Sequence, residues 1–110
     1  MTKTIIRRGD IFYIDFDKNR KDIDKCRAAL ICSNDLLNEY SESVMVAPIT
    51  SNLHKIYSFE YIINCDDMDG KIMFDQIRSI SKSRILNKIH SLSDQNMKQV
   101  DIIIRQILGI

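Results

Sequence analysis

An arginine stands at the head of an apolar run, and its permanent charge needs an explanation. Arg27 opens the stretch RAALICS, residues 27–33, which has the composition of a buried strand and ends at a turn signal. A guanidinium stays protonated in proteins and presents a planar fork of donors that fits oxyanions. Two interpretations are open. Arg27 is either a catalytic group that stabilises negative charge, or an ion-paired cap with Asp22, Asp24 or Asp35 as its partner.

Motifs for several common chemistries are missing from the sequence. It has no glycine-rich phosphate loop, no GxSxG elbow, no HExxH helix and no DxDxDG loop. Cys26, Cys32 and Cys65 form no CxxC pair and have no nearby histidine, so reduced thiols are expected. His54 and His90 are isolated in the sequence and are assigned no role. An enzyme with this sequence is expected to work with side chains alone, without metal or cofactor.

Length, charge and hydropathy favour one domain in the cytoplasm. A chain of 110 residues is expected to fold as a single domain, residues 1–110, that buries roughly two-thirds of its unfolded surface. The 16 Lys and Arg residues against 15 Asp and Glu give a net charge of +1, so any nucleic-acid surface must be local. No segment is apolar for long enough to span a membrane, and the N-terminal residues lack the features of a signal peptide.

The elements that must position these residues are predicted to be mostly strands. Aromatic, β-branched and alternating residues predict five strands, at 11–16, 27–33, 44–50, 57–65 and 71–80. A long charged loop, 17–25, separates the first two strands, and residues 66–70 form a turn before the fifth. Pro48 indicates an edge or a bulge in the third strand, because proline donates no ladder hydrogen bond.

The C-terminal segment is predicted to be an amphipathic helix. Ser93 or Asp94 can cap it. Its apolar residues recur at i, i+3 and i+4 spacing: Met97, Val100, Ile103, Ile104, Ile107 and Leu108. Short strands followed by one such helix predict a small, strongly bent β-sheet or barrel that the helix closes.

A set of short motifs, in order along the chain, resembles the MazF/PemK toxin family. The motifs are Arg8-Gly9-Asp10, Arg27, Ser33-Asn34-Asp35, Ala47-Pro48-Ile49-Thr50-Ser51, Asp75-Gln76-Ile77-Arg78, Leu92-Ser93-Asp94, Met97 and Val100-Asp101. Each motif alone is common, but the ordered set at compatible spacing covers nearly the whole chain. The resemblance implies a mainly β (α+β) fold, namely an SH3-like small barrel of a strongly bent antiparallel sheet with a C-terminal amphipathic helix.

The resemblance also implies a toxin that cleaves single-stranded mRNA at specific sequences without metal. RNA carries its own nucleophile, the 2′-OH, so such an enzyme deprotonates it, holds the phosphate in line, neutralises charge and protonates the leaving 5′-oxygen. In the family an arginine and a threonine form the catalytic pair, and Arg27 and Thr50 match those positions. The implied products are a 2′,3′-cyclic phosphate and a free 5′-hydroxyl. Thr50 could instead serve only the strand or a turn hydrogen bond.

The group that takes the proton is left open by the sequence. Asp75 stands where some family members carry an acidic residue proposed as the base, but Met73 replaces the arginine that those members place two residues earlier. Asp75 is therefore a candidate base or nucleobase contact. It could also be structural, pairing with Arg78 or accepting a backbone N–H.

Further polar residues are candidates for RNA binding: Arg8, Lys18, Arg20, Ser51, Asn52, Gln76 and Arg78. The two that lie in the loop after the first strand either grip phosphates or stay in solvent. That loop lacks the glycines usual in the family, and Ala28 replaces the proline that usually follows the catalytic arginine. Gln76 and Arg78 could instead brace the barrel, and Arg8 could belong only to the turn before the first strand.

The resemblance implies partners as well as a substrate. They are a second copy of the chain in a homodimer and a cognate MazE-like antitoxin, with DNA contacted only indirectly through an antitoxin complex and no membrane involved. An alternative is a non-catalytic toxin on the same fold, the CcdB type, which binds DNA gyrase through its C-terminal residues. Arg27 and Thr50 favour the nuclease, because a gyrase-binding protein does not need them. The tail, residues 107–110, also lacks the aromatic side chain that such binding would use.

Overall fold

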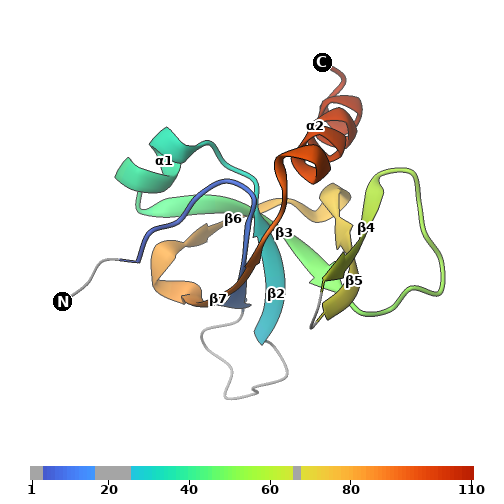
Figure 1. Ribbon diagram of the computed structural model, residues 1–110. Helices are drawn as coiled ribbons and strands as arrows, with labels where there is room; N and C mark the ends of the chain where they lie inside the picture. The colour runs from blue at the N-terminus through green and yellow to red at the C-terminus, as the bar shows by residue number, and fades with distance from the viewer. Residues whose placement is uncertain (1–3, 17–25, 66–67) are drawn as a thin grey trace.

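The computed structural model describes residues 4–16, 26–65 and 68–110, which form a curled sheet with two α-helices (Figure 1). Within these ranges the sheet has seven strands: β1 (Asp10–Asp15), β2 (Cys26–Ile31), β3 (Ser43–Thr50), β4 (Glu60–Cys65), β5 (Met68–Met73), β6 (Arg78–Ser81) and β7 (Ile85–Ser91). The helices are α1 (Asp35–Tyr40) and α2 (Asp94–Leu108), and the 3-10 turns η2 (Phe74–Gln76) and η3 (Lys82–Arg84) flank β6. The strands pair antiparallel in the order β4-β5-β3-β2-β1-β7, with β6 also on β3.

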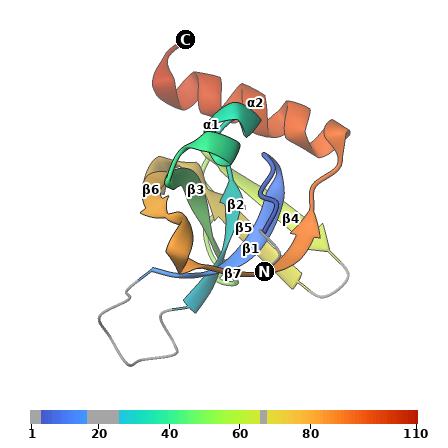
Figure 2. The ribbon, with the colours of Figure 1, turned by 90° about the vertical axis from the view of Figure 1, so that its left-hand side faces the viewer.

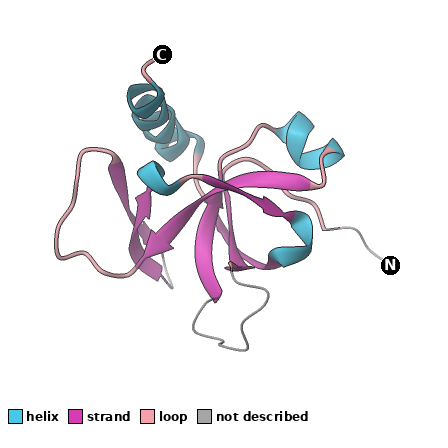
Figure 3. Cartoon of the chain, turned by 180° about the vertical axis from the view of Figure 1, so that it is seen from behind, coloured by secondary structure: helices cyan, strands magenta, loops and turns pink. Residues whose placement is uncertain are grey.

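The sheet is strongly curled (Figure 3). As a result, β1 and β2 contribute side chains to two separate cores. The helix-side core contains Ile11, Ala28, Leu30, Ala47, Ile49, Ile63, Ile72, Phe74 and Val100. The second core contains Phe12, Ile14, Ala29, Ile31, Val44, Val46 and Ile80. Apart from the exposed Tyr13, the apolar residues of β1 and β2 therefore alternate between two apolar interiors, which explains their nearly continuous apolar sequences. The predicted bent antiparallel sheet is confirmed.

The predicted C-terminal helix is confirmed and lies along one side of the curled sheet (Figure 2). The Ser93 side chain caps it by accepting a hydrogen bond from Asn96 N, and Gly109, at φ 74°, ends it in the left-handed conformation. Val100 is fully buried in the helix-side core, whereas Leu108 is 63% exposed. The apolar stripe therefore packs on the sheet as far as Ile104 and leaves the C-terminal end of the helix exposed.

Pro48 does not mark an edge of the sheet, contrary to that part of the prediction. β3 pairs with β2 on one side, where Pro48 lies opposite Ala29, and with β6 and β5 on the other. The pairing with β6 ends at Val46 and the pairing with β5 begins at Ile49. Pro48 lies in the gap between these two partners, where β3 loses nothing by lacking an N–H group on that side.

The predicted fifth strand, 71–80, is divided by η2 into β5 and the start of β6. Both strands lie on the same side of β3, where Ile49 pairs with Ile72 and Val46 pairs with Arg78. Between these pairs β3 advances by three residues and the opposite chain by six, so three residues must leave the ladder. They form η2, which turns Phe74 into the helix-side core.

Other boundaries also differ from those that the sequence predicts. β4 begins only at Glu60, because the chain before it forms a loop, and β5 begins at Met68 inside the predicted turn. β7 was not predicted, since its side chains are half-buried or exposed and show no alternation. α1 follows directly after the turn signal that ends the second predicted strand, and the Asn34 side chain caps this helix by accepting a hydrogen bond from Leu37 N. Neither described α-helix is long and apolar enough to cross a membrane.

Candidate active site

The structure brings three of the predicted residues together in one cavity, where β2 begins and β3 ends. The cavity has a volume of about 450 Å³, and it is called the catalytic cavity below. It is lined by Tyr13, Arg27, Ala28, Ile49, Thr50, Ser51, Met68 and Asp69. Arg27, Thr50 and Ser51 were predicted as site residues from sequence.

Strand register explains why Arg27 and Thr50 meet. β2 and β3 pair through Ala29 with Pro48, Leu30 with Ala47 and Ile31 with Val46. The same register continued by two residues sets Arg27 directly across from Thr50, where side chains on the same face of a sheet are neighbours. The pairing of Ile14 with Arg27 fixes β2 from its other side. Two adjacent strands therefore hold the cation and the hydroxyl in place.

The Arg27 guanidinium is exposed and makes no hydrogen bond or ion pair with any other residue that the structure describes. Of the cap partners considered above, Asp35 instead accepts hydrogen bonds from Arg8 N at 2.7 Å and Asn38 Nδ2 at 3.4 Å. Asp22 and Asp24 lie outside the described residues. The donors of Arg27 are open to an anionic ligand, as a catalytic role requires.

Thr50 begins a turn that leaves its own proton available. Its Oγ1 accepts a hydrogen bond from Asn52 N at 3.2 Å, and Asn52 Oδ1 in turn accepts one from His54 N at 3.0 Å. A hydroxyl that accepts a bond still has its O–H to donate. The turn hydrogen bond suggested as an alternative role for Thr50 is therefore present, and it is compatible with donation to a phosphate.

A buried ion pair supports the loop that follows Thr50. Lys71, which pairs with Thr50 across β3 and β5, places its Nζ 3.0 Å from Glu60 Oε1 and also donates to the carbonyl oxygen of Lys55. Glu60 Oε1 accepts a further hydrogen bond from Tyr57 N at 2.8 Å. The side chains of Lys71 and Glu60 are only 10% and 5% exposed. Together they join the middle and the C-terminal part of the loop 51–59 to the sheet.

Asp75 and Gln76 lie outside the catalytic cavity. Both belong to η2, and Asp75 lines a separate cavity of about 570 Å³ together with Arg8 and side chains of α2. The structure therefore does not bring Asp75 to Arg27 and Thr50 within one chain. Gln76 Nε2 contacts Met73 Sδ at 3.7 Å. The roles predicted for Asp75 and Gln76 stay predictions.

Arg8 is engaged in contacts within the protein. Its Nε donates to the carbonyl oxygen of Cys32 at 2.8 Å, and its Nη1 lies 2.8 Å from Asp101 Oδ1. That oxygen accepts no well-aligned hydrogen bond from the described residues, so the ion pair with Arg8 is what compensates its burial. Arg8 thus joins the chain before β1 to α2. Its predicted RNA contact would compete with these bonds.

The remaining predicted RNA contacts fall in different places. Arg78 is exposed at the start of β6, and its guanidinium carbon lies 5.1 Å from the centre of the Phe16 ring. Asn52 belongs to the turn after Thr50 and is not among the described residues that line the catalytic cavity. Lys18 and Arg20 lie outside the described residues, so their predicted role stays a prediction.

Tyr13 and Asp69 line the catalytic cavity but were not selected from the sequence. Tyr13 is 44% exposed, although its neighbours in the strand are buried, and nothing in that apolar run distinguishes it in the sequence. Asp69 was assigned to a turn rich in carboxylates, where no pattern distinguishes one acid from the next. The structure places it in β5 instead.

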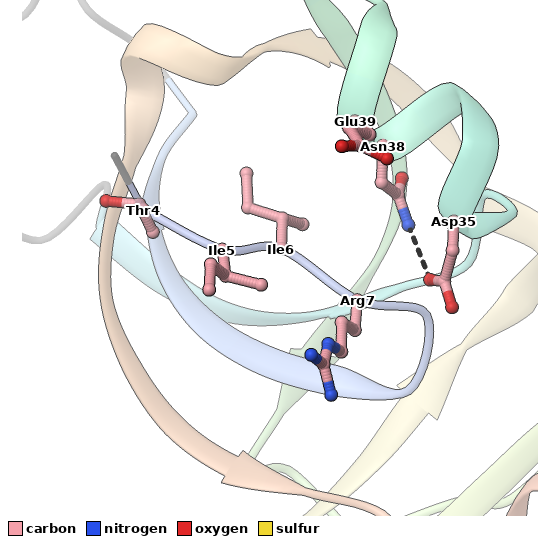
Figure 4. A pocket seen from close by; sticks show the side chains of 7 residues that line it. All are labelled: Thr4, Ile5, Ile6, Arg7, Asp35, Asn38 and Glu39. Atoms are coloured by element: carbon pink, nitrogen blue, oxygen red, sulfur yellow. Dashed lines mark hydrogen bonds between the residues drawn. The ribbon is translucent and has the colours of Figure 1, made fainter. Parts of the chain in front are cut away.

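Two further features do not contribute to this site. A cavity of about 310 Å³ lies between the N-terminal residues Thr4–Arg7 and α1, and it contains none of the predicted catalytic or RNA-binding residues (Figure 4).

Burial raises the pKa of the Cys32 thiol to about 12, although the charge of Arg8 opposes the shift, so this thiol is protonated and unreactive at neutral pH. The described residues contain no group of three His, Cys, Asp or Glu side chains that could hold a metal ion.

Comparison with known proteins identifies the family and agrees with this fold. A family model described as "PemK-like, MazF-like toxin of type II toxin-antitoxin system" matches residues 7–108. Endoribonuclease MazF9 of Mycobacterium tuberculosis is 32% identical over 107 residues, which cover 88% of this chain and 91% of that protein.

Solved structures of MazF proteins have the same fold. A MazE–MazF crystal structure from Deinococcus radiodurans superposes with a TM-score of 0.80 at 21% identity, covering 98% of this chain and 99% of that one. An endoribonuclease in complex with its cognate antitoxin, from a mycobacterial species, gives a TM-score of 0.81 at 17% identity, with 96% of each chain covered.

The fold is therefore that of the MazF toxins, a strongly curled antiparallel half-barrel with a C-terminal helix. The chain belongs to the PemK-like, MazF-like toxins of type II toxin-antitoxin systems. The family and the fold class predicted from the sequence motifs are both confirmed.

We predict that Gly70→Ala disturbs the site through packing. A Cβ at residue 70 would lie 2.9 Å from both the carbonyl oxygen of Thr50 and Ile49 Cγ2, so β3 or β5 must move. The expected loss is about 1–3 kcal/mol of stability, measured by urea denaturation, together with a lower rate of RNA cleavage. Gly109→Ala is the control, because a Cβ there meets nothing within 4 Å. Its φ of 74° costs some stability but leaves cleavage unchanged. A Gly70→Ala variant with wild-type stability and rate would contradict the packing argument.

We also predict that Lys71→Met destabilises the protein by about 3–5 kcal/mol, because it leaves the buried Glu60 carboxylate without its cation. Denaturation in urea measures the loss. The double variant Glu60→Gln/Lys71→Met should recover part of it, since no buried charge is then uncompensated. Lys98→Met, on the exposed face of α2, should stay within about 0.5 kcal/mol of wild type. Equal losses for Lys71→Met and Lys98→Met would show that the buried pair contributes nothing.

Proposed function

We propose that this MazF-like toxin is a sequence-specific, metal-independent endoribonuclease that cleaves single-stranded RNA through attack by the ribose 2′-OH. The main support is that two adjacent strands bring Arg27 and Thr50 to the wall of one open cavity, with the donors of Arg27 unpaired among the described residues. Similarity to a mycobacterial endoribonuclease supports the same class of activity.

Arg27 and Thr50 supply the charge stabilisation that the reaction requires. Attack of the 2′-oxygen on the neighbouring phosphorus makes a pentacoordinate species with added negative charge on its non-bridging oxygens. Arg27 can donate two parallel N–H bonds to these oxygens, and Thr50 can donate its O–H to one of them. Because both residues are on strands, they are already in position before the substrate binds. Cleavage of the bond to the 5′-oxygen leaves a 2′,3′-cyclic phosphate and a 5′-hydroxyl.

Single-stranded RNA suits an open cavity with a partly exposed aromatic wall. In-line attack requires the nucleotide to leave the stacked helical geometry, which unpaired RNA does at little cost. Tyr13 offers a face on which a base can stack, and Ser51 offers a polar group beside the phosphate site. Asn52 is tied to Thr50 by its backbone N–H. Arg8, Gln76 and Arg78 would contact RNA only at a distance from this cavity. Contacts of these side chains with the RNA set the sequence at which it is cut.

A homodimer and a cognate antitoxin are the expected partners in the cytoplasm. The apolar end of α2 lines the cavity that contains Asp75, and Leu108 is 63% exposed there. Ile62 on the edge strand β4 is 51% exposed. Apolar surface of this kind is covered in an assembly. An acidic antitoxin segment can compete with RNA for Arg27, and DNA would be contacted only through such a complex. The similar solved structures include MazE–MazF complexes.

We predict that Arg27→Ala and Thr50→Ala abolish most of the cleavage. Loss of one group that stabilises the transition state lowers the rate by about 10²–10³-fold, while Thr50→Ser, which keeps the hydroxyl, should stay within about tenfold of wild type. The measurement is primer-extension mapping of a long RNA, with and without EDTA, after each variant has been shown to be folded. Labelling of the new ends by polynucleotide kinase without prior phosphatase treatment would identify 5′-hydroxyls.

Arg105→Ala is the control for the loss of an exposed arginine outside the cavity, and it should cleave RNA like wild type. Discrete cuts that persist in EDTA and disappear with Arg27→Ala would support the proposal. Inert RNA, or cuts that survive in both alanine variants of the catalytic cavity, would contradict it and leave a gyrase-binding toxin as the alternative.

A further inference from the structure

The proposed cleavage needs a group that takes the proton from the 2′-OH, and neither Arg27 nor Thr50 is suited to this step. An arginine side chain keeps its own proton in proteins, and a threonine hydroxyl is a poor base. One acidic residue is found among the described residues that line the catalytic cavity, namely Asp69. We propose that Asp69 is the general base of the reaction, a role that rests on the proposed ribonuclease function.

Asp69 reaches the cavity from the strand on the other side of Thr50. The sheet order places β3 between β2 and β5, so Arg27, Thr50 and Asp69 lie on three successive strands. Thr50 pairs with Lys71, and Asp69 comes two residues before Lys71, where β5 runs past the end of β3. A phosphate held by Arg27 and Thr50 therefore has the carboxylate on the side opposite to the arginine.

The neighbour of Asp69 in sequence explains how close β5 can approach the site. Gly70 packs against the carbonyl oxygen of Thr50, and even one carbon atom added there would be 2.9 Å from it. On its other side β5 is held by β4, where Asp69 pairs with Asn64 and Gly70 with Ile63. The backbone that carries Asp69 is thus held by its pairing with Asn64 on β4 and by the close packing of Gly70 on β3, although the Asp69 side chain is exposed.

Within the part of the chain that the structure describes, the Asp69 carboxylate is unengaged, unlike the carboxylates of Asp10 and Asp101. It makes no hydrogen bond or ion pair with any described residue. In contrast, Asp10 accepts bonds from Ser91 Oγ and Arg7 N, and Asp101 pairs with Arg8. A carboxylate without protein partners can accept a proton from a ligand without losing a structural contact.

The chemical step balances with Asp69 in this role. Its carboxylate takes the 2′-OH proton as the 2′-oxygen forms its bond to phosphorus, and the bond between phosphorus and the 5′-oxygen breaks. The 5′-oxygen takes up a proton from solvent water, which the open cavity admits, and the Asp69 carboxylic acid returns its proton to solvent. No oxidant, metal or further reactant is required.

Asp75 is the competing candidate, and its position argues against it within one chain. It lies on η2, beyond the other end of β5, and lines the cavity beneath α2 with Arg8. To act on a phosphate at Arg27, it would have to come from a second copy of the chain. Asp69 needs no such arrangement, and this difference can be tested with isosteric variants.

The test compares Asp69→Asn, Asp75→Asn and wild type on one RNA with a mapped cleavage site. Single-turnover rates give the chemical step, and binding is measured with the same RNA carrying a 2′-deoxynucleotide at the cut position. We expect Asp69→Asn to slow cleavage by about 10²–10⁴-fold with affinity within threefold of wild type. The wild-type rate should fall at acidic pH, because protonation inactivates the base, and the rate of Asp69→Asn should not show this fall. Asp94→Asn, exposed in the first turn of α2, is the matched control and should cleave normally.

Asp69→Glu keeps a carboxylate and should cleave faster than Asp69→Asn, which a purely structural role would not produce. An Asp69→Asn rate within threefold of wild type would overturn the proposal, as would a fall in affinity equal to the fall in rate. A loss confined to Asp75→Asn would assign the base to that residue instead. If wild type cuts RNA and Arg27→Ala does not, any of these results contradicts only the role of Asp69. A wild type that cuts no RNA overturns the ribonuclease function and this inference together.

Discussion

The geometry of the candidate site depends on one strand, β3, which pairs with three neighbours. Its register with β2 sets Thr50 across from Arg27, and its register with β5 brings Asp69 to the same cavity. The change of partner from β6 to β5 occurs around Pro48, where an absent N–H leaves no donor unpaired on that side. A shift of β3 relative to either neighbour would separate the hydroxyl from the cation or the carboxylate, so the strand pairing that stabilises the fold also sets the distances needed for chemistry.

The protein pairs its structural charges and leaves those of the site unpaired. Lys71 and Glu60 form a buried pair under the loop after Thr50, and Arg8 joins the chain before β1 to Asp101 on α2. By contrast, Arg27 and Asp69 have no partner among the described residues. Both are exposed, so solvation keeps the free-energy cost of leaving them unpaired low, whereas a buried unpaired charge would be costly. A bound phosphodiester can therefore interact with both groups without first breaking bonds inside the protein.

Sequence reasoning recovered the central strands and the last helix because their residues face apolar interiors with a clear pattern. β1, β2 and β3 are nearly continuous apolar runs, and α2 shows helical spacing. β7 was missed because an edge strand with mostly exposed side chains carries no such pattern. The division of residues 71–80 by η2 depends on a register difference of three residues along β3, which only the folded chain reveals. Arg27 and Thr50 could be chosen from their strand positions and the family motifs. Asp69 could not be chosen in this way. Its place in the cavity follows from where β5 begins.

The central claim is that Arg27 and Thr50 act on the same phosphate, and a double-mutant cycle on the rate of the chemical step tests it most directly. Single-turnover rates would be measured for wild type, Arg27→Ala, Thr50→Ala and the double variant. Groups that stabilise one transition state as a unit give strongly non-additive losses. We predict that the double variant loses little more activity than Arg27→Ala alone. Losses that multiply, so that the effect of Thr50→Ala is the same with and without Arg27, would show that the two residues act independently and would contradict the account.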